Sequence, residues 1–252
     1  PGLSDAQFQA ERDRLDRAYP VGEPVGGLMT GCLEEFEETG RFWVRNALSD
    51  IELDLLDDAC RVESKPGVRL KWNDALRVAL GANSSIGPIC ETVQAGTKAV
   101  RLVAFDKSAD ANWGVPWHQD RVIAVQERHD LEGYKAWSNK DGFWHCEPPI
   151  GILQTMFFVR VHLDNTDSRN GCLEIAAGTH KLGRIPSDLA KDIAMAAPLE
   201  VCSASRGDLL FVKALTLHRS GSSSCQSDGH RRALRVDYSS ETLPCPLQWA
   251  GQ

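Results

Sequence analysis

Residues 207–218 read Gly-Asp-Leu-Leu-Phe-Val-Lys-Ala-Leu-Thr-Leu-His, which is a turn signal followed by an apolar run and a histidine. Gly207-Asp208 predicts the turn, and the run at 209–217 predicts a buried strand. Four similar apolar runs lie at 99–105, 152–163, 173–176 and 233–238, separated by clusters of Gly, Asn, Asp and Ser. Because no helices of about 10–15 residues intervene, these strands favour an antiparallel barrel or sandwich over a parallel sheet.

The N-terminal third has a different pattern, which indicates helices. Apolar residues among many charges predict helices at 4–19, 32–39 and 49–62, with a short strand at 41–46. Ser49 and Glu52 have the spacing of a capping box at the start of the third helix. We therefore expect one mainly β domain with flanking helices over residues 1–252, in which 1–98 form a helical buttress and 99–245 form a β-barrel core.

Composition excludes several classes of protein. The 252 residues are 42% apolar and 25% charged, which is typical of a folded protein with a packed core. The net charge of −7, with both signs interspersed, argues against a nucleic-acid partner and against a basic membrane-binding patch. We expect the partner to be a small molecule and the chain to be a monomer or homodimer.

The eight cysteines and the apolar runs indicate the compartment. The cysteines lie far apart with no Cys-x-x-Cys pair, so we expect buried thiols, and neither a disulfide framework nor a structural zinc site. No uncharged apolar run reaches the roughly 20 residues of a membrane span, and the first residues lack the apolar core of a signal peptide. These features predict a cytoplasmic protein with no membrane segment.

Three residues have the chemistry of a metal site. Trp117-His118-Gln119-Asp120 places an imidazole and a carboxylate two residues apart, which is the same face of a strand. Such a pair alone is more often structural than metal-binding. His218, at the end of another predicted strand, adds the third ligand. Two histidines and one carboxylate form the facial triad of non-haem Fe(II) oxygenases, which leaves metal positions open for a co-substrate and O₂.

A run of arginines follows the second histidine. In the predicted strand that opens at Arg231, alternation places Arg231, Ala233 and Arg235 on one face and Arg232 on the other. A guanidinium fork inside a barrel is suited to binding a carboxylate. The small Ala233 favours Arg231 for that role, Arg232 is the possible substitute, and both could instead be ordinary surface residues of an edge strand.

The order of these motifs resembles the phytanoyl-CoA dioxygenase family of Fe(II)/2-oxoglutarate oxygenases. The motifs are Phe36 to Val44 (FEETGRFWV), Trp117 to Asp120 (WHQD), Asn170 to Glu174 (NGCLE), Gly178 to His180 (GTH), Gly207-Asp208, His218 to Gly221 (HRSG) and Arg231 to Ala233 (RRA). One departure is Ala177-Gly178-Thr179-His180, where the family usually has Pro-Gly-Ser-His.

The resemblance implies a fold and a set of roles. The fold is a double-stranded β-helix, that is, a jelly-roll or cupin-like barrel. His118, Asp120 and His218 are the implied iron ligands and Arg231 is the implied partner of the distal carboxylate of 2-oxoglutarate. Ser220 resembles a second contact to 2-oxoglutarate, and Trp137 resembles an aromatic wall of that pocket.

From these residues we expect an Fe(II)/2-oxoglutarate-dependent dioxygenase that uses O₂ and hydroxylates an unactivated C–H bond while 2-oxoglutarate becomes succinate. The carboxylate of Asp120 occupies the position that halogenating relatives leave small. The alternatives are a cupin-like metalloenzyme that does not use 2-oxoglutarate, and a non-catalytic barrel that binds a metal or a small molecule. Arg231 discriminates, because the first alternative needs no carboxylate-binding fork.

The substrate is less well specified. The 22 residues 128–149 form a long connection, which we expect to be an irregular, mobile cover whose Trp137, Trp144 and His145 shape the substrate pocket. The alternative is that these tryptophans only fix the loop to the barrel. Arg121 and Lys107, which flank the His-x-Asp strand, are either substrate contacts or surface charges. A natural product, an amino-acid derivative and an acyl thioester all remain open, as do desaturation and cyclisation beside hydroxylation.

Overall fold

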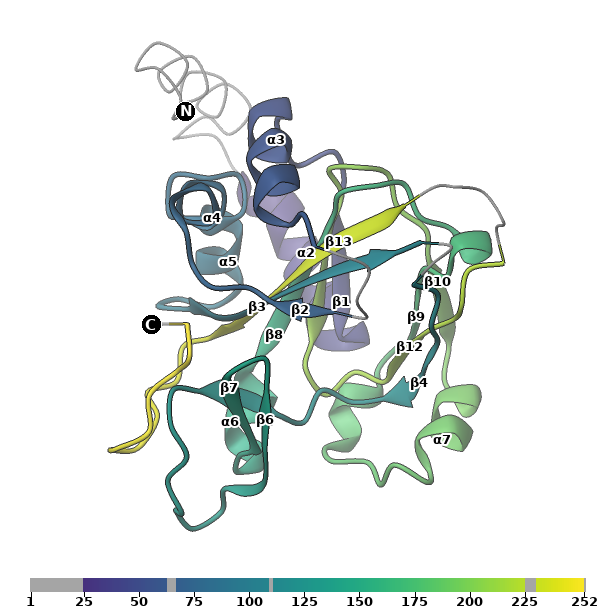
Figure 1. The fold of residues 1–252 in the computed structure, drawn as a ribbon. Coiled ribbons are helices and arrows are strands. Elements are labelled where there is room, and N and C mark those ends of the chain that lie inside the picture. The colour runs from purple at the N-terminus through teal and green to yellow at the C-terminus, as the bar shows by residue number, and fades with distance from the viewer. Residues whose placement is uncertain (1–24, 63–66, 109–110, 225–229, 252) are drawn as a thin grey trace.

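The computed structural model describes residues 25–62, 67–108, 111–224 and 230–251. The helix expected at 4–19 lies outside these residues. Within them, two antiparallel sheets face each other, helices cover one side of the larger sheet, and a small third sheet lies at one end (Figure 1). This arrangement confirms the expected mainly β, antiparallel fold.

The larger sheet has six strands, all paired antiparallel to their neighbours. In spatial order they are β1 (Arg41–Val44), β11 (Leu209–Lys213), β8 (Phe157–His162), β13 (Arg231–Ser239), β3 (Lys98–Lys107) and β2 (Val68–Arg69). Both edge strands, β1 and β2, come from the N-terminal third. That third is therefore not purely helical, and it contributes directly to the sheet.

The smaller sheet has four strands and faces the larger one. In spatial order they are β10 (Leu199–Cys202), β9 (Leu173–Ala176), β12 (His218–Ser220) and β4 (Val115–His118). Phe158, Leu210 and Val212 of the larger sheet pack with Leu173 and Ile175 of the smaller one. The interior between the two sheets is thus a narrow apolar core, and any polar side chain on these inner faces needs a partner there.

Helices of the N-terminal third pack on the outer face of the larger sheet. They are α2 (Val25–Thr39), α3 (Asp50–Ala59), α4 (Asp74–Leu80) and α5 (Gly87–Val93). Phe36, Leu56 and Leu76 from these helices share one buried cluster with Leu102 and Val236 of the sheet. The expected capping box is present, since Ser49 accepts from the Glu52 N–H and Glu52 accepts from the Ser49 N–H.

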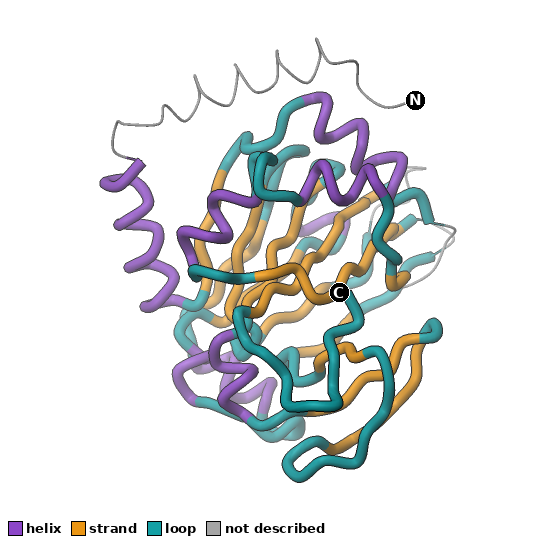
Figure 2. Tube along the Cα trace, turned by 90° about the vertical axis from the view of Figure 1, so that its left-hand side faces the viewer, coloured by secondary structure: helices purple, strands orange, loops and turns teal. Residues whose placement is uncertain are grey.

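The third sheet corrects the expectation of an irregular cover at 128–149. This segment contains β6 (Lys135–Lys140) and β7 (Phe143–Glu147), which form a hairpin and pair with β5 (Ile123–Val125). Asp141 and Gly142 make the turn with positive φ angles of 54° and 82°. The hairpin packs on a second apolar cluster, and an isolated bridge joins Val125 to Trp249 beside the chain's last residues (Figure 2).

Two strand predictions were wrong in their extent. Residues 150–155 form α6 (Ile150–Thr155), and only then does β8 begin, because a continuous apolar run does not distinguish a buried helix from a buried strand. The strand predicted at 209–217 ends at Lys213, and a turn leads to His218. The remaining helices are α7 (Ala190–Ala196) and two 3₁₀ turns, η1 (Ser168–Asn170) and η2 (Thr179–Leu182).

The described cysteines are all free thiols, and most are buried, as expected. In the described part of the chain, no helix has the length and apolar character needed to cross a bilayer.

Candidate metal centre

Two strands of the smaller sheet bring the three predicted ligands together. His118 ends β4 and His218 begins β12, and the two residues are directly paired across these strands. Asp120 follows β4, and its Oδ2 lies 3.3 Å from His218 Nε2. One ligand atom from each of the three residues lies within 4.8 Å of the other two. Neighbouring ligands of an octahedral metal with bonds of about 2.1 Å are about 3 Å apart, so small side-chain shifts suffice to bind one ion.

Backbone carbonyls set the ring tautomers of both histidines. Nδ1 of His118 lies 2.8 Å from the Pro116 oxygen, and Nδ1 of His218 lies 2.9 Å from the Thr216 oxygen. Each Nδ1–H therefore donates to a carbonyl, which leaves the Nε2 lone pair for a metal. Burial, followed by the neighbouring His118, lowers the pKa of His218 to about 3, so this imidazole is neutral at physiological pH.

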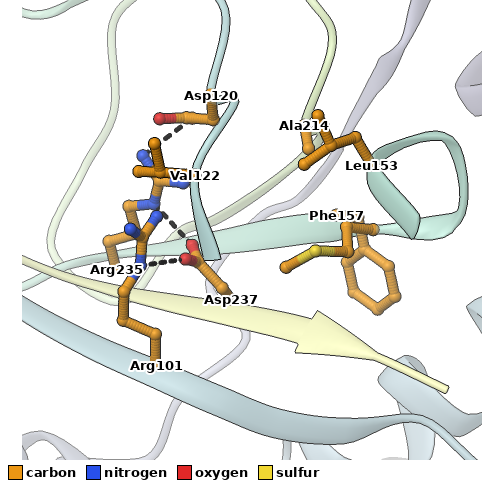
Figure 3. A pocket seen from close by; sticks show the side chains of 9 residues that line it. Arg101, Asp120, Val122, Leu153, Phe157, Ala214, Arg235 and Asp237 are labelled. Carbon is orange, nitrogen blue, oxygen red and sulfur yellow. Dashed lines mark hydrogen bonds and ion pairs between the residues drawn. The ribbon is translucent and has the colours of Figure 1, made fainter. Parts of the chain in front are cut away.

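Asp120 is kept ionised by a chain of buried ion pairs (Figure 3). Arg235 Nη1 lies 2.8 Å from Asp120 Oδ2, Arg235 Nε donates to Asp237 Oδ1 at 2.6 Å, and Arg101 also donates to Asp237. Burial alone would raise the pKa of Asp120, but Arg235 and the two imidazoles bring it well below its usual range. The donor set of two neutral imidazoles and one carboxylate fits a divalent metal such as iron.

The same strand that carries Arg235 presents Arg231 to the interior. Arg231 is only 4% exposed, and its Nε and Nη1 have no hydrogen-bond partner. Arg232 points the other way, where Asp164 accepts from its Nε at 2.9 Å and Asp57 lies 3.0 Å from its Nη1. Burial lowers the pKa of Arg231 to about 10. Arg232 is therefore already paired with carboxylates, whereas the guanidinium of Arg231 is open to an anion.

Two further cations lie beside Arg231, of which the sequence analysis named only Lys107, as either a substrate contact or a surface charge. Lys107 is directly paired with Arg231 across β3 and β13, and Arg160 on β8 also lies close to it. Both are buried, and among the described residues none of the three cations has a carboxylate within ion-pair distance. Burial, followed by Arg231, lowers the pKa of Lys107 to about 7. The sequence does contain an indication for Arg160, because it is a charged residue inside an apolar run.

Ser220 and Gly171 complete this end of the barrel. The Lys107 ammonium donates to the Gly221 oxygen and lies 3.3 Å from Ser220 Oγ, which in turn donates to the Gly171 oxygen. Gly171 has a φ of +72°, and a Cβ there would lie 2.3 Å from the Gly221 oxygen and 2.9 Å from Lys107 Nζ. Only glycine allows this close approach.

A narrow gap separates the charged residues at Asp120 from an apolar wall. Asp120, Arg101, Arg235 and Asp237 form one side, and Leu153, Met156, Phe157 and Ala214 line the other (Figure 3). The gap has a volume of about 10 Å³, which is about the room for one water molecule.

The structure places the other predicted site residues on the third sheet or near it. Trp137 and Trp144 pack edge to face on the hairpin, 6.5 Å apart, and Arg128 lies over Trp137. These contacts hold Trp137 on the hairpin, and they do not place it beside Arg231, where we expected an aromatic wall of the 2-oxoglutarate pocket. Arg121 is held by an ion pair with Glu147 at 2.9 Å.

His145 is the one residue of the predicted cover that is buried near the charged network. Its Nδ1 lies 3.0 Å from the Phe143 oxygen, and its Nε2 has no partner. Burial, with Arg101 and Arg69 next in effect, lowers the pKa of His145 to about 4. His145 is therefore a neutral side chain beside two guanidinium groups.

Solved structures share this fold at low sequence identity. AviO1 from Streptomyces viridochromogenes Tue57 is 16% identical, with a TM-score of 0.61 over 86% of this chain and 96% of that one. The epimerase SnoN from nogalamycin biosynthesis, in complex with Fe3+, alpha ketoglutarate and nogalamycin RO, is 17% identical, with a TM-score of 0.61 over 84% and 83%. EctD from S. alaskensis, with 2-oxoglutarate and 5-hydroxyectoine, is 12% identical, with a TM-score of 0.62 over 88% and 78%.

The sequence comparisons agree with the motifs. No curated protein sequence matches the chain. The family model of phytanoyl-CoA dioxygenase (PhyH) matches residues 36–233, which is most of the chain and runs from Phe36 through Ala233. This match confirms the resemblance carried by the ordered motifs, and the chain belongs to the phytanoyl-CoA dioxygenase family.

Proposed function

We propose that the protein is an Fe(II)/2-oxoglutarate-dependent oxygenase that hydroxylates a small organic substrate, and that the whole chain forms one catalytic domain. One observation carries the proposal. The same barrel interior holds a ligand set suited to iron, at His118, Asp120 and His218, and a buried guanidinium, at Arg231, that has no carboxylate partner among the described residues. A metal enzyme without an anionic co-substrate has no use for the buried guanidinium of Arg231.

Arg231 is the residue that binds the distal carboxylate of 2-oxoglutarate. A buried cation without a partner is unfavourable, and a carboxylate that accepts from the guanidinium fork offsets this. Lys107 lies beside it and offers a further donor to the same carboxylate, and Ser220 would donate to it by turning its O–H away from the Gly171 oxygen. Arg232 is already engaged by Asp164 and Asp57, which leaves it no such role.

Iron held by His118, Asp120 and His218, with 2-oxoglutarate at Arg231, would supply O₂-dependent oxidation of a C–H bond, with succinate and CO₂ as co-products. The chain supplies binding and orientation. His118 and His218 offer Nε2 lone pairs because their Nδ1 protons are held by carbonyls. Arg235 holds Oδ2 of Asp120 and fixes the rotation of this carboxylate. Leu153 and its apolar neighbours limit the water beside the site.

The experiment is metal and co-substrate binding without oxygen. We expect one Fe(II) per chain and, on adding 2-oxoglutarate anaerobically, the visible absorption of the chelate. His118→Ala should lose both, whereas His129→Ala, in a loop of the third sheet, should keep both. With O₂ restored, 2-oxoglutarate should yield succinate. Unchanged iron content in the His118→Ala variant, or no 2-oxoglutarate complex in the wild type, would overturn the proposal.

A further inference from the structure

A cavity of about 230 Å³ lies between the edge of the larger sheet and the third sheet. Its lining includes three cations, Arg69, Lys71 and Arg101, and no carboxylate from the part of the chain that the structure describes. Trp72 and Phe143 give it aromatic walls. The proposed function assigns no role to this cavity.

The cavity belongs to a face of the sheet that is rich in positive charge. Residues directly opposite one another in antiparallel strands share a face, and so do residues two or four apart along one strand. By register, the inner face of four strands of the larger sheet, β2, β3, β8 and β13, carries six cations, which are Arg69, Arg101, Lys107, Arg160, Arg231 and Arg235. This local excess contrasts with a net charge of −7 for the chain.

The carboxylates near these cations do not balance them. Asp237 is shared by Arg101 and Arg235, and Arg235 also pairs with Asp120. Asp141, at the exposed hairpin turn, lies 3.2 Å from Arg69. A divalent metal and dianionic 2-oxoglutarate carry equal and opposite charges, so their binding leaves the positive excess unchanged. The positive excess therefore remains beside the cavity when both are bound.

Arg101 joins the cavity to the metal ligands. Its side chain lines the 230 Å³ cavity and also the gap beside Asp120. His145, on the same hairpin strand as Phe143, is close to Arg101 and Arg69 and adds no negative charge there. Arg69 Nε and Trp72 Nε1 are buried donors without partners. Unsatisfied donors beside a cationic cavity are suited to oxygen acceptors.

We propose that this cavity binds an oxyanion group of the substrate, a carboxylate or a phosphate, through Arg69, Lys71 and Arg101. The substrate is thus an organic acid, and Arg101 lines both its cavity and the gap beside Asp120. This assignment of substrate class rests on the proposed function for the oxidation step. The anion site itself stands on the cavity and its charges.

The test uses an aromatic acid and its neutral counterpart. Binding of 3-phenylpropanoate, 2-phenylethyl phosphate and 3-phenylpropanamide is measured by calorimetry, anaerobically, with Fe(II) and saturating 2-oxoglutarate so that Arg231 is occupied. We expect one of the acids to bind at least about 10-fold more tightly than the amide, as for hydrogen bonds to charged groups. Which acid is preferred distinguishes a carboxylate substrate from a phosphate substrate.

Variants locate the binding. The double variant Arg69→Gln/Lys71→Gln should lose the preference for the acid, with a fall of about 10-fold or more in its affinity. Arg101 is left unchanged because it pairs with Asp237. The control Arg61→Gln/Lys191→Gln removes two exposed charges that do not line the cavity and should keep the preference. Melting temperatures should stay close to wild type, since the Arg69–Asp141 pair is partly exposed.

Each outcome bears on one proposal. Equal binding of acids and amide, no binding of either acid at millimolar concentration, or an unchanged preference in the Arg69→Gln/Lys71→Gln variant would overturn the anion site. The absorption of the Fe(II)·2-oxoglutarate complex is recorded in the same samples. Selective binding of an acid without that complex would retain the anion site and overturn the oxygenase proposal.

Discussion

Replacing Arg231 by methionine should stabilise the ligand-free protein and abolish tight binding of 2-oxoglutarate. Burial moves the pKa of Arg231 from 12.5 to about 10, and each pKa unit corresponds to about 1.4 kcal/mol. The buried, unpartnered charge therefore destabilises the ligand-free protein by about 3 kcal/mol. Methionine has similar length and no charge, so Arg231→Met recovers up to this amount, in line with the 1–4 kcal/mol gained when apolar residues replace buried ions.

The affinity for 2-oxoglutarate should change in the opposite direction. Removing one partner of a buried charge pair costs about 3–5 kcal/mol, which corresponds to a loss of about 100-fold to several thousand-fold in affinity. The assay is denaturant unfolding with and without anaerobic Fe(II) and 2-oxoglutarate. In the wild type, ligand at 100 times its Kd adds about 2.7 kcal/mol of stability, and in the variant this increment should vanish.

Arg232→Met is the matched control on the opposite face of the strand. It loses partly exposed pairs with Asp164 and Asp57, so its unfolding free energy should fall by about 1 kcal/mol while 2-oxoglutarate still stabilises it. A less stable Arg231→Met variant that keeps the wild-type increment from 2-oxoglutarate would refute the assignment of Arg231 and the reasoning from its missing partner.

Three other changes test separate parts of the structure. His145 has a pKa of about 4 in the folded protein and about 6.5 in the unfolded chain, so the free energy of unfolding falls as the pH drops from 6.5 to 4. His145→Gln should reduce the slope of the unfolding free energy against pH in this range by up to about 1.4 kcal/mol per pH unit. An unchanged slope would contradict the burial argument. Gly171→Ala places a Cβ against Gly221 and Lys107 at positive φ, so the free energy of unfolding, measured by thermal denaturation, should fall by about 1–3 kcal/mol and 2-oxoglutarate should bind more weakly. A variant with wild-type stability and binding would show that the contact relaxes freely. Glu52 is buried and accepts from the N–H and Oγ–H of Ser85, so Glu52→Ala should lower the unfolding free energy by about 2–4 kcal/mol without changing iron content, and a loss below 1 kcal/mol would mean that water replaces these bonds.

The sequence was most informative where chemistry and strand alternation coincide. His118 and Asp120 are two residues apart on one strand, and strand pairing brings His218 beside them. Alternation along β13 correctly separates Arg231 from Arg232, because one face of this strand is the barrel interior and the other meets Asp57 and Asp164.

Features that depend on long-range pairing could not be predicted. Strand β2 has only two residues, so no local pattern shows that Arg69 joins the inner face of the larger sheet. The hairpin at 135–147 has irregular register and a positive φ at Ala136, which hides its alternation. A lysine at a strand end is usually exposed, and the burial of Lys107 arises from its partner strand and from Ser220 and Gly221, which are distant in the sequence.

The position of β4 at the edge of the smaller sheet gives the metal a mechanical role. This strand has four residues and is paired on one side only, to β12. Because His118 and Asp120 belong to β4 or its end and His218 belongs to β12, one ion cross-links two segments about 100 residues apart in the chain and fixes their register. Removal of the metal by a chelator should therefore separate β4 from β12 before the rest of the barrel unfolds. Amide hydrogen exchange at 115–118 should then accelerate, while that of the central strands stays slow. An edge strand released in this way is a template for pairing with other chains, so metal content would govern the protein's tendency to aggregate.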